Sequence, residues 1–267
     1  MGANLDQIVA ATRRRLSDSR SSADLRALER AAAAHVPRGF RDGLQQTAQR
    51  GPAIIAELKK ASPSKGLIRS DFRPAELARE LEAAGAAALS VLTNEEFFQG
   101  SLDNLRIASE TVGLPCLRKD FIVDEFQVVE ARANRADAIL LIVAALQDGE
   151  LRKLAAAAQA HGLDVLCEAH DEEELRRALD AGCTLVGVNA RNLKTFEVDL
   201  ATLFDLAEKF PAGVVVVAES GIRSQSDIAD LRAAGYHAFL IGETLMRAAH
   251  PGEALKSLLA GVGVESR

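Results

Sequence analysis

Residues 138–168 read AILLIVAALQDGELRKLAAAAQAHGLDVLCE. The apolar run Ala138–Val143 predicts a buried strand, and the Ala- and Leu-rich run Gly149–His161 predicts a helix that ends at Gly162. The run Asp164–Glu168 predicts the next strand. A strand, a helix and a strand at this spacing form a βαβ unit, which is the building block of a parallel sheet.

The same alternation extends in both directions from this unit. Eight strands are predicted, at Ala53–Lys59, Ala88–Thr93, Cys116–Lys119, Ala138–Val143, Asp164–Glu168, Leu185–Asn189, Val214–Glu219 and Ala238–Gly242. Helices are predicted at Pro74–Ala84, Leu102–Thr111, Glu125–Ala133, Gly149–His161, Glu172–Ala181, Leu200–Lys209, Gln225–Ala234 and Gly252–Ala260. Eight such units favour an α/β fold of the (β/α)8 TIM-barrel type. The alternative is a doubly wound open sheet, but no GxGxxG or GxxxxGK[ST] turn follows the first strand.

The first fifty residues lie outside this alternation. Helices are predicted at Leu5–Arg15 and Ser22–Ala34, and a polar lead-in is predicted from Gly43 to Gly51. We expect residues 1–50 to form an N-terminal helical extension that covers one end of the barrel. Residues 51–267 are then the (β/α)8 barrel catalytic domain.

The composition of the chain limits its function class. It has 267 residues, 48% of them hydrophobic and 26% charged, which is typical of an ordinary globular protein and not of a disordered one. Its net charge of −6 argues against nucleic acid as a partner. The longest apolar run, Ala138 to Leu146, is too short to cross a membrane, and residues 1–20 lack the apolar core of a signal peptide. We therefore expect a cytoplasmic protein with no membrane partner.

Cysteine and histidine spacing argues against metal binding. Cys116, Cys167 and Cys183 form no CxxC motif, and the five histidines show no metal-ligand spacing. We expect the three cysteines to be reduced, buried thiols and the protein to contain no metal.

Charged residues gather at the predicted strand ends, where active sites of such barrels lie. Glu57 and Lys59 are two residues apart and share one face of the first strand, which points into the barrel if Ile54 and Leu58 pack outward. Later strand ends add Lys119, Glu168, Asn189, Arg191, Glu219 and Glu243. Each residue alone could form a structural ion pair or lie in a solvated loop, but together they predict a catalytic cavity.

Two glycines suggest the class of ligand. Gly221 and Gly242 end the seventh and eighth strands, and a helix-like stretch follows each of them. Barrels of this type often bind phosphate there through backbone N–H groups. Two ordinary βα turns are the alternative. The pattern predicts a phosphorylated small-molecule substrate.

Six motifs together resemble the indole-3-glycerol phosphate synthase family over nearly the whole chain. They are IAELKKASPSKG at residues 55–66, SVLTNEEFFQG at 90–100, LRKDF at 117–121, GVNARNL at 187–193, AESGI at 218–222 and IGETLM at 241–246. The resemblance implies a carboxy-lyase of tryptophan biosynthesis that needs no cofactor. Such an enzyme converts 1-(2-carboxyphenylamino)-1-deoxyribulose 5-phosphate to indole-3-glycerol phosphate, with loss of carbon dioxide and water. Neighbouring enzymes of that pathway are the expected protein partners.

The matched motif positions also imply roles for individual residues. Lys119 would be the general acid that activates the ketone, Glu168 a general acid/base in the dehydration, and Lys59 a contact of the substrate carboxylate. Glu57, Asn189 and Glu219 would orient the lysines and the substrate hydroxyls. Arg191 would approach the anthranilate end. The phosphate would be bound, largely through backbone N–H groups, by Ser220, Gly221, Gly242 and Glu243, with Ser62 as a further substrate contact. The aromatic ring would lie against Phe98, Phe121, Leu193 and Ile222. The segment Ala61–Arg69 would be a mobile loop over the site.

Two other functions are less consistent with the sequence. Phosphoribosylanthranilate isomerase, another phosphate-binding barrel, uses a Cys at the end of strand one and an Asp at the end of strand six, where this chain has Glu57 and Asn189. A barrel that only binds a phosphorylated ligand, or an interaction module, would be expected to have lost Lys59, Lys119 or Glu168. All three are present.

Overall fold

The computed structural model describes residues 4–193 and 195–261, and within them eight parallel strands close into a barrel. The strand order around the barrel is β1-β10-β9-β8-β7-β6-β5-β4. The strands are β1 (Ala53–Leu58), β4 (Ala88–Leu92), β5 (Cys116–Lys119), β6 (Ala138–Ile142), β7 (Asp164–Ala169), β8 (Leu185–Asn189), β9 (Val215–Glu219) and β10 (Ala238–Ile241). The predicted (β/α)8 barrel is confirmed.

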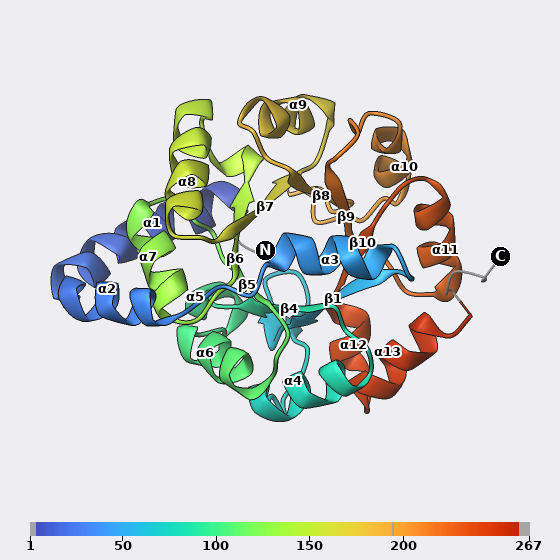
Figure 1. The fold of residues 1–267 in the computed structure, drawn as a ribbon, viewed down its shortest axis with the longest axis horizontal. Coiled ribbons are helices and arrows are strands. Elements are labelled where there is room, and N and C mark those ends of the chain that lie inside the picture. The colour runs from blue at the N-terminus through green and yellow to red at the C-terminus, as the bar shows by residue number, and fades with distance from the viewer. Residues whose placement is uncertain (1–3, 194, 262–267) are drawn as a thin grey trace.

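Helices connect successive strands and surround the barrel (Figure 1). They are α4 (Pro74–Ala83), α6 (Leu102–Thr111), α7 (Glu125–Ala133), α8 (Asp148–Ala160), α9 (Glu172–Asp180), α10 (Ala201–Ala207), α11 (Gln225–Ala233) and α13 (Pro251–Leu259). Three short helical segments lie at the strand ends: α5 (Glu95–Phe98), η1 (Val143–Ala145) and α12 (Glu243–Arg247). Helix starts follow local capping chemistry; Asp124, for example, accepts from the backbone of α7 in a capping box with Gln127.

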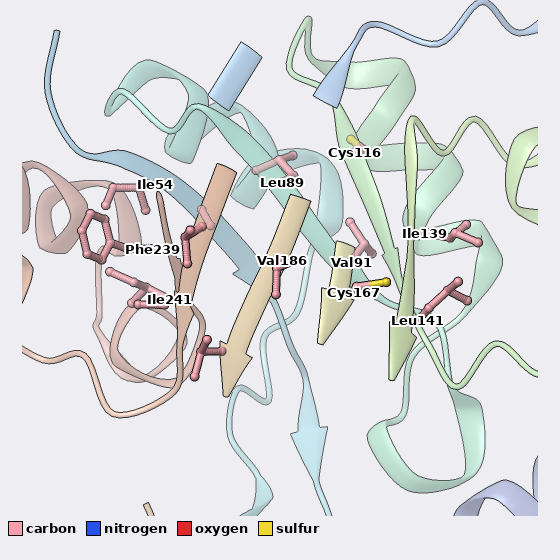
Figure 2. Close-up of a cluster of buried hydrophobic side chains, with 14 of the residues drawn as sticks. Ile54, Leu89, Val91, Cys116, Ile139, Leu141, Cys167, Val186, Phe239 and Ile241 are labelled. Carbon is pink, nitrogen blue, oxygen red and sulfur yellow. The ribbon is translucent and has the colours of Figure 1, made fainter. Parts of the chain in front are cut away.

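The alternation of side chains along the strands produces two separate apolar clusters. Outward-facing residues such as Ile54 and Leu58 pack against the helices, and Figure 2 shows part of this outer cluster, with Ile54 of β1 near Phe239 and Ile241 of β10. Inward-facing residues such as Ile55 fill the barrel interior. Because Glu57 and Lys59 continue the inward face of β1, their side chains point into the barrel as expected.

The segment before β1 differs from its prediction. It forms three helices, α1 (Leu5–Ser22), α2 (Leu25–Ala34) and α3 (Phe40–Ala48), so the predicted polar lead-in is largely helical. Phe40 and Leu44 share one helix face and are fully buried in the inner cluster. In Figure 1, α3 lies across the ring of strands.

The helices before β1 contact both ends of the barrel, and not only the one end that was expected. The backbone N–H of Arg41 in α3 donates to Asp164 at the start of β7, which places α3 at the N-terminal strand ends. Leu5 and Ile8 of α1 line the cavity at the opposite ends. The division into an extension of residues 1–50 and a barrel of residues 51–267 stays a prediction.

Two of the three cysteines are not free thiols. The structure joins Cys167 and Cys183 in a disulfide, with their Cα atoms 6.5 Å apart. Helix α9 returns the chain to β8, whose Val186 pairs with Cys167, so two cysteines distant in sequence become neighbours. Only Cys116 matches the prediction: it is free, and burial raises the pKa of its thiol to about 12.

Among the helices of the described residues, none is both long and apolar enough to cross a membrane. Those residues also contain no cluster of three or more His, Cys, Asp or Glu arranged to bind a metal ion.

Candidate active site

A cavity of about 710 Å³ opens at the C-terminal ends of the strands. Every site residue predicted from the sequence lies in its wall: Glu57, Lys59, Ser62, Phe98, Lys119, Phe121, Glu168, Asn189, Arg191, Leu193, Glu219, Ser220, Gly221, Ile222, Gly242 and Glu243. The predicted loop over the site contains a small antiparallel hairpin of β2 (Ala61–Ser62) and β3 (Gly66–Leu67). The tertiary structure therefore brings residues from all parts of the barrel sequence to one concave surface.

The deepest part of the cavity contains two groups of ion pairs. Lys119 of β5 lies 3.1 Å from Glu168 of β7 and 3.3 Å from Glu219 of β9. Beside β1, the Nζ atom of Lys59 lies 2.5 Å from Oε1 of Glu57. All three glutamates are buried, so their charges interact in a poorly hydrated environment.

This arrangement sets the charge of Lys119 and Glu168. Burial alone would lower the pKa of Lys119, but Glu168, Glu219 and Glu57 raise it well above its usual value. Burial alone would raise the pKa of Glu168, but Lys119, and then His170, lower it well below its usual value. Lys119 is thus an ammonium group and Glu168 a carboxylate at neutral pH.

Glu219 behaves differently from Glu168. Burial raises the pKa of its carboxyl group, and the negative charges of Glu168 and Glu57 raise it further. The positive charge of Lys119 lowers the pKa by less than this, so that the net result is a pKa of about 8. Within the described chain neither of its oxygens accepts a hydrogen bond. A buried carboxyl group without hydrogen bonds is available to a ligand, so Glu219 can donate to or accept from a polar group that enters the cavity.

The position of Lys119 is fixed by its two neighbours in sequence. Arg118 is almost fully buried and points away from the cavity, where it pairs with Asp120 at 3.3 Å and with Glu130 at 2.8 Å. Asp120 in turn accepts from Thr93 at 2.7 Å and from the backbone N–H of Phe121 at 2.9 Å. This buried network holds the end of β5 and with it the ammonium group of Lys119.

Two glycines make room for the buried carboxylates. A Cβ atom at Gly187 would overlap Oε1 of Glu219, and a Cβ atom at Gly242 would overlap Oε1 of Glu57. The sequence suggested Gly242 only for the approach of a phosphate. The packing shows that it is also required because Glu57 occupies the space of the missing side chain.

The loops after β9 and β10 form one side of the cavity. Ser220 and Gly221 both have positive φ, at 70° and 81°, and the hydroxyl of Thr244 donates to the carbonyl oxygen of Ile222 at 2.9 Å, which joins the two loops. Three cations that the sequence analysis did not name also line this side: Lys65, Arg223 and Arg247. The positive charge of these side chains, and a glycine backbone that a ligand can approach closely, suit the binding of an anionic group.

The opposite side of the cavity is apolar. The rings of Phe98 and Phe121 lie 6.2 Å apart and tilted by 39°, beside Leu193. Sequence reasoning missed other apolar residues of the wall, namely Leu5, Ile8, Leu140, Ile142 and Phe196. The sequence could have predicted Ile142 as a cavity residue, because it lies on the same inward face of β6 as Leu140. Leu5 and Phe196 come from a helix and a loop whose positions depend on tertiary contacts.

Asn189 and Arg191 define the edge of this apolar side. The side-chain oxygen of Asn189 accepts from the backbone N–H of Arg191 at 3.0 Å. The guanidinium group of Arg191 donates to the carbonyl oxygen of Phe196 at 3.0 Å. These bonds place a cation next to the aromatic pocket, where a carboxylate on a ring substituent would meet it.

Comparisons with known proteins agree with this geometry. A family model described as indole-3-glycerol phosphate synthase matches residues 5–258. Two similar proteins carry that same name. The one from Koribacter versatilis is 59% identical over 97% of this chain and 100% of its own length, and the one from Leptothrix cholodnii is 49% identical over 96% of this chain and 98% of its own.

Solved structures support the fold alone. The crystal structure titled 3-hexulose-6-phosphate synthase has a TM-score of 0.63 at 19% identity, and it covers 79% of this chain and 99% of its own. The structure titled thiamine phosphate pyrophosphorylase from Pyrococcus furiosus has a TM-score of 0.59 at 16% identity, covering 77% of this chain and 93% of its own.

Proposed function

Because this chain belongs to the indole-3-glycerol phosphate synthase family and has the carboxy-lyase activity of that family in tryptophan biosynthesis, we propose how its residues carry the reaction. The observation that carries the proposal is the buried triad in which Lys119 lies between Glu168 and Glu219. It stands below a cavity with an anion-binding side and an aromatic side.

The shape of the cavity orients the substrate. Its phosphate is bound largely by backbone N–H groups of Ser220, Gly221, Gly242 and Glu243, with Ser62 beside it. The cations Lys65, Arg223 and Arg247, the last of them paired with Glu243 at 2.9 Å, offset the negative charge. The anthranilate ring lies between Phe98, Phe121, Leu193 and Ile222, and its carboxylate meets Lys59 and Arg191. In this pose the ribulose ketone lies over Lys119.

Ring closure needs a proton donor at the ketone oxygen. Attack of the aromatic carbon on the ketone carbon forms the new carbon–carbon bond and moves an electron pair onto that oxygen. Lys119, an ammonium group at neutral pH, donates the proton. Loss of carbon dioxide from the same aromatic carbon then returns the electron pair of the broken bond to the ring.

Dehydration needs a base and an acid. Glu168, a carboxylate at neutral pH, takes the proton from the carbon next to the new bond, while the hydroxyl group leaves as water with a proton from a lysine. Glu57 holds Lys59 in place at 2.5 Å, and Glu219 and Asn189 bind substrate hydroxyls. Glu219 retains its proton up to a pH of about 8, so it donates a hydrogen bond to them.

Substitution of Lys119 by Ala tests these roles. We expect a folded protein whose turnover falls about 10²-fold or more, because the general acid is lost. The appearance of indole fluorescence after addition of the carboxyphenylamino-deoxyribulose phosphate measures turnover directly, since the chain contains no Trp that would contribute background. Turnover close to that of the unmodified protein would refute the role of Lys119.

The location and the protein partners stay proposals. The enzyme acts in the cytoplasm and associates with neighbouring enzymes of tryptophan biosynthesis. Co-purification of a tagged chain from its native cells, followed by identification of the retained proteins, tests the second statement, and recovery of the chain alone would contradict it.

A further inference from the structure

His170 is a largely buried titratable group beside the site, and the reaction described above does not use it. It follows β7 directly, and its Nε2 atom lies 3.4 Å from Oε1 of Glu168. Its Nδ1 atom lies 2.9 Å from Oε2 of Glu174. The described residues that line the cavity do not include His170, so its ring contacts Glu168 from behind the cavity wall.

The two oxygens of Glu168 therefore have different partners. Oε2 lies 3.1 Å from the ammonium group of Lys119, and Oε1 faces the ring of His170. The carboxyl group is almost fully buried, so water does not replace either partner. Nε2 of His170 makes no hydrogen bond to a described residue, so at 3.4 Å the ring acts on Oε1 through its charge. A carboxylate attracted at both oxygens prefers one orientation, whereas a single partner would leave it free to turn about its terminal bond.

The ring of His170 is itself held by α9. Oε2 of Glu174 accepts both from Nδ1 of the ring and from the backbone N–H of His170, each at 2.9 Å. The backbone N–H of Glu174 donates to Asp171, the N-cap of the helix, at 2.8 Å. The first turn of α9 thus fixes Glu174, and Glu174 fixes the ring with Nε2 directed at Glu168.

The two carboxylates determine the charge of the ring. Burial alone would lower the pKa of His170, but Glu168 and Glu174 raise it to about 10. The η1 residues and the β8 residues Gly187 and Val188 are themselves uncharged. The charged side chains next to them are Asp171, which caps α9, and Arg177, which donates to the carbonyl oxygens of Val143 and Leu146 and pairs with Asp148. The remaining charged groups around Glu168 are Lys119 and Glu219 on the cavity side.

We infer that His170 is a positioning residue for the synthase reaction: held as an imidazolium by Glu174, it keeps Glu168 ionised and oriented toward Lys119. The inference rests on the role proposed above for Glu168. His170 touches no part of the substrate and acts only through the carboxylate. Its removal should therefore affect turnover and not substrate binding.

The first experiment uses the unmodified protein. We expect NMR of ¹⁵N-labelled histidine to show both ring nitrogens of His170 protonated from pH 6 to pH 8. Because the coupling between two titrating groups is reciprocal, Glu168→Gln should lower the pKa of His170 by about one unit or more. A neutral ring at pH 7 in the unmodified protein, or a pKa that does not move in Glu168→Gln, would overturn the inference even if every His170 variant failed to fold.

The second experiment measures kinetics. In His170→Asn the carboxylate of Glu168 loses one of its two partners, so kcat at neutral pH should fall about tenfold because the carboxylate is less well oriented. The loss of the nearby cation should also raise the pKa of Glu168 and move the acid limb of the kcat profile to higher pH. KM should not change. The matched control is His250→Asn, an exposed histidine outside the cavity wall, which should keep the kcat and pH profile of the unmodified protein.

The outcomes separate the two proposals. If Glu168→Gln abolishes turnover while His170→Asn has an unchanged kcat and pH profile, the inference about His170 is wrong and the role of Glu168 stands. If Glu168→Gln retains turnover, the proposed role of Glu168 fails first. A His170→Asn protein that is less stable but has normal kcat would show a purely structural role and would also overturn the inference.

Discussion

Substitution of Gly187 by Ala tests the packing of the catalytic carboxylates most directly. The new methyl group would overlap Oε1 of Glu219 and lie 3.2 Å from its Cδ atom and 3.3 Å from Cδ1 of Leu166. Leu166 is fully buried and has no room to move, and the end of Glu219 can move only toward the cavity that it lines. The strain must therefore be taken up by the side chain of Glu219 or by the strands themselves.

The expected magnitudes follow from overpacking and misplacement. Adding one methyl group to a well-packed core typically costs about 1–3 kcal/mol, and because the overlapping atom is the end of a side chain that borders the cavity, we expect the free energy of unfolding to fall by about 1 kcal/mol. If Glu219 moves by about 1 Å, turnover falls about 10²-fold. Urea denaturation followed by far-ultraviolet circular dichroism measures the first quantity, because the chain has no Trp to report unfolding, and product fluorescence measures the second.

Two further variants control this experiment. Gly149→Ala places the same methyl group in α8 with no atom within 4 Å, so it should leave stability unchanged or raise it by up to about 1 kcal/mol. The variant Glu219→Ala lacks the oxygen atoms that the new methyl group would overlap. When Gly187→Ala is made in that variant, the free energy of unfolding that it removes should be smaller by about 0.5 kcal/mol or more. Full turnover and stability in Gly187→Ala, or strictly additive effects in the double variant, would refute the reasoning.

Three other substitutions test separate parts of the structure. Gly221→Val should raise KM for the ribulose phosphate and also destabilise the protein. Gly221 has a φ of 81°, and a Cβ atom there would lie 2.8 Å from side chains of the loop that follows β8. An unchanged KM would argue against the anion site. The ordinary pKa of a glutamate is 4.5, and in the folded protein the pKa of Glu219 is raised to about 8. Between these two pH values the folded protein keeps a proton that the unfolded chain has released. The free energy of unfolding therefore falls as the pH rises through this range. Glu219→Gln should flatten that slope in urea denaturation series from pH 5 to pH 8, and an unchanged slope would contradict the assignment. Arg118→Ala leaves the buried Asp120 and the partly buried Glu130 without their cation, and a loss of about 3 kcal/mol is expected in the same assay. A loss below about 1 kcal/mol would show that the network does not hold β5.

Local sequence patterns predicted much of the site because the chemistry of a barrel enzyme lies at its strand ends. The parity of β1 is enough to place Glu57 and Lys59 inside the barrel, since successive side chains of a strand point to opposite faces. The same rule applied one step beyond β7 would have directed attention to His170, which shares the parity of Glu168. Its partner Glu174 lies on the next helix, and no strand parity indicates where that helix places it.

The sequence by itself determined the eight alternating strands and helices, the inward faces of the strands and the motifs of the synthase family, because each of these depends only on residues that are close together in the chain. Only the tertiary structure decided which strand ends meet: Lys119 pairs with Glu168 and Glu219, and not with the Glu57 of the first strand. It also decided that α3 closes the N-terminal end of the barrel and that Gly187 leaves space for Glu219. These features depend on barrel closure and on the packing of side chains from distant segments, and such contacts leave no periodic signal in the chain.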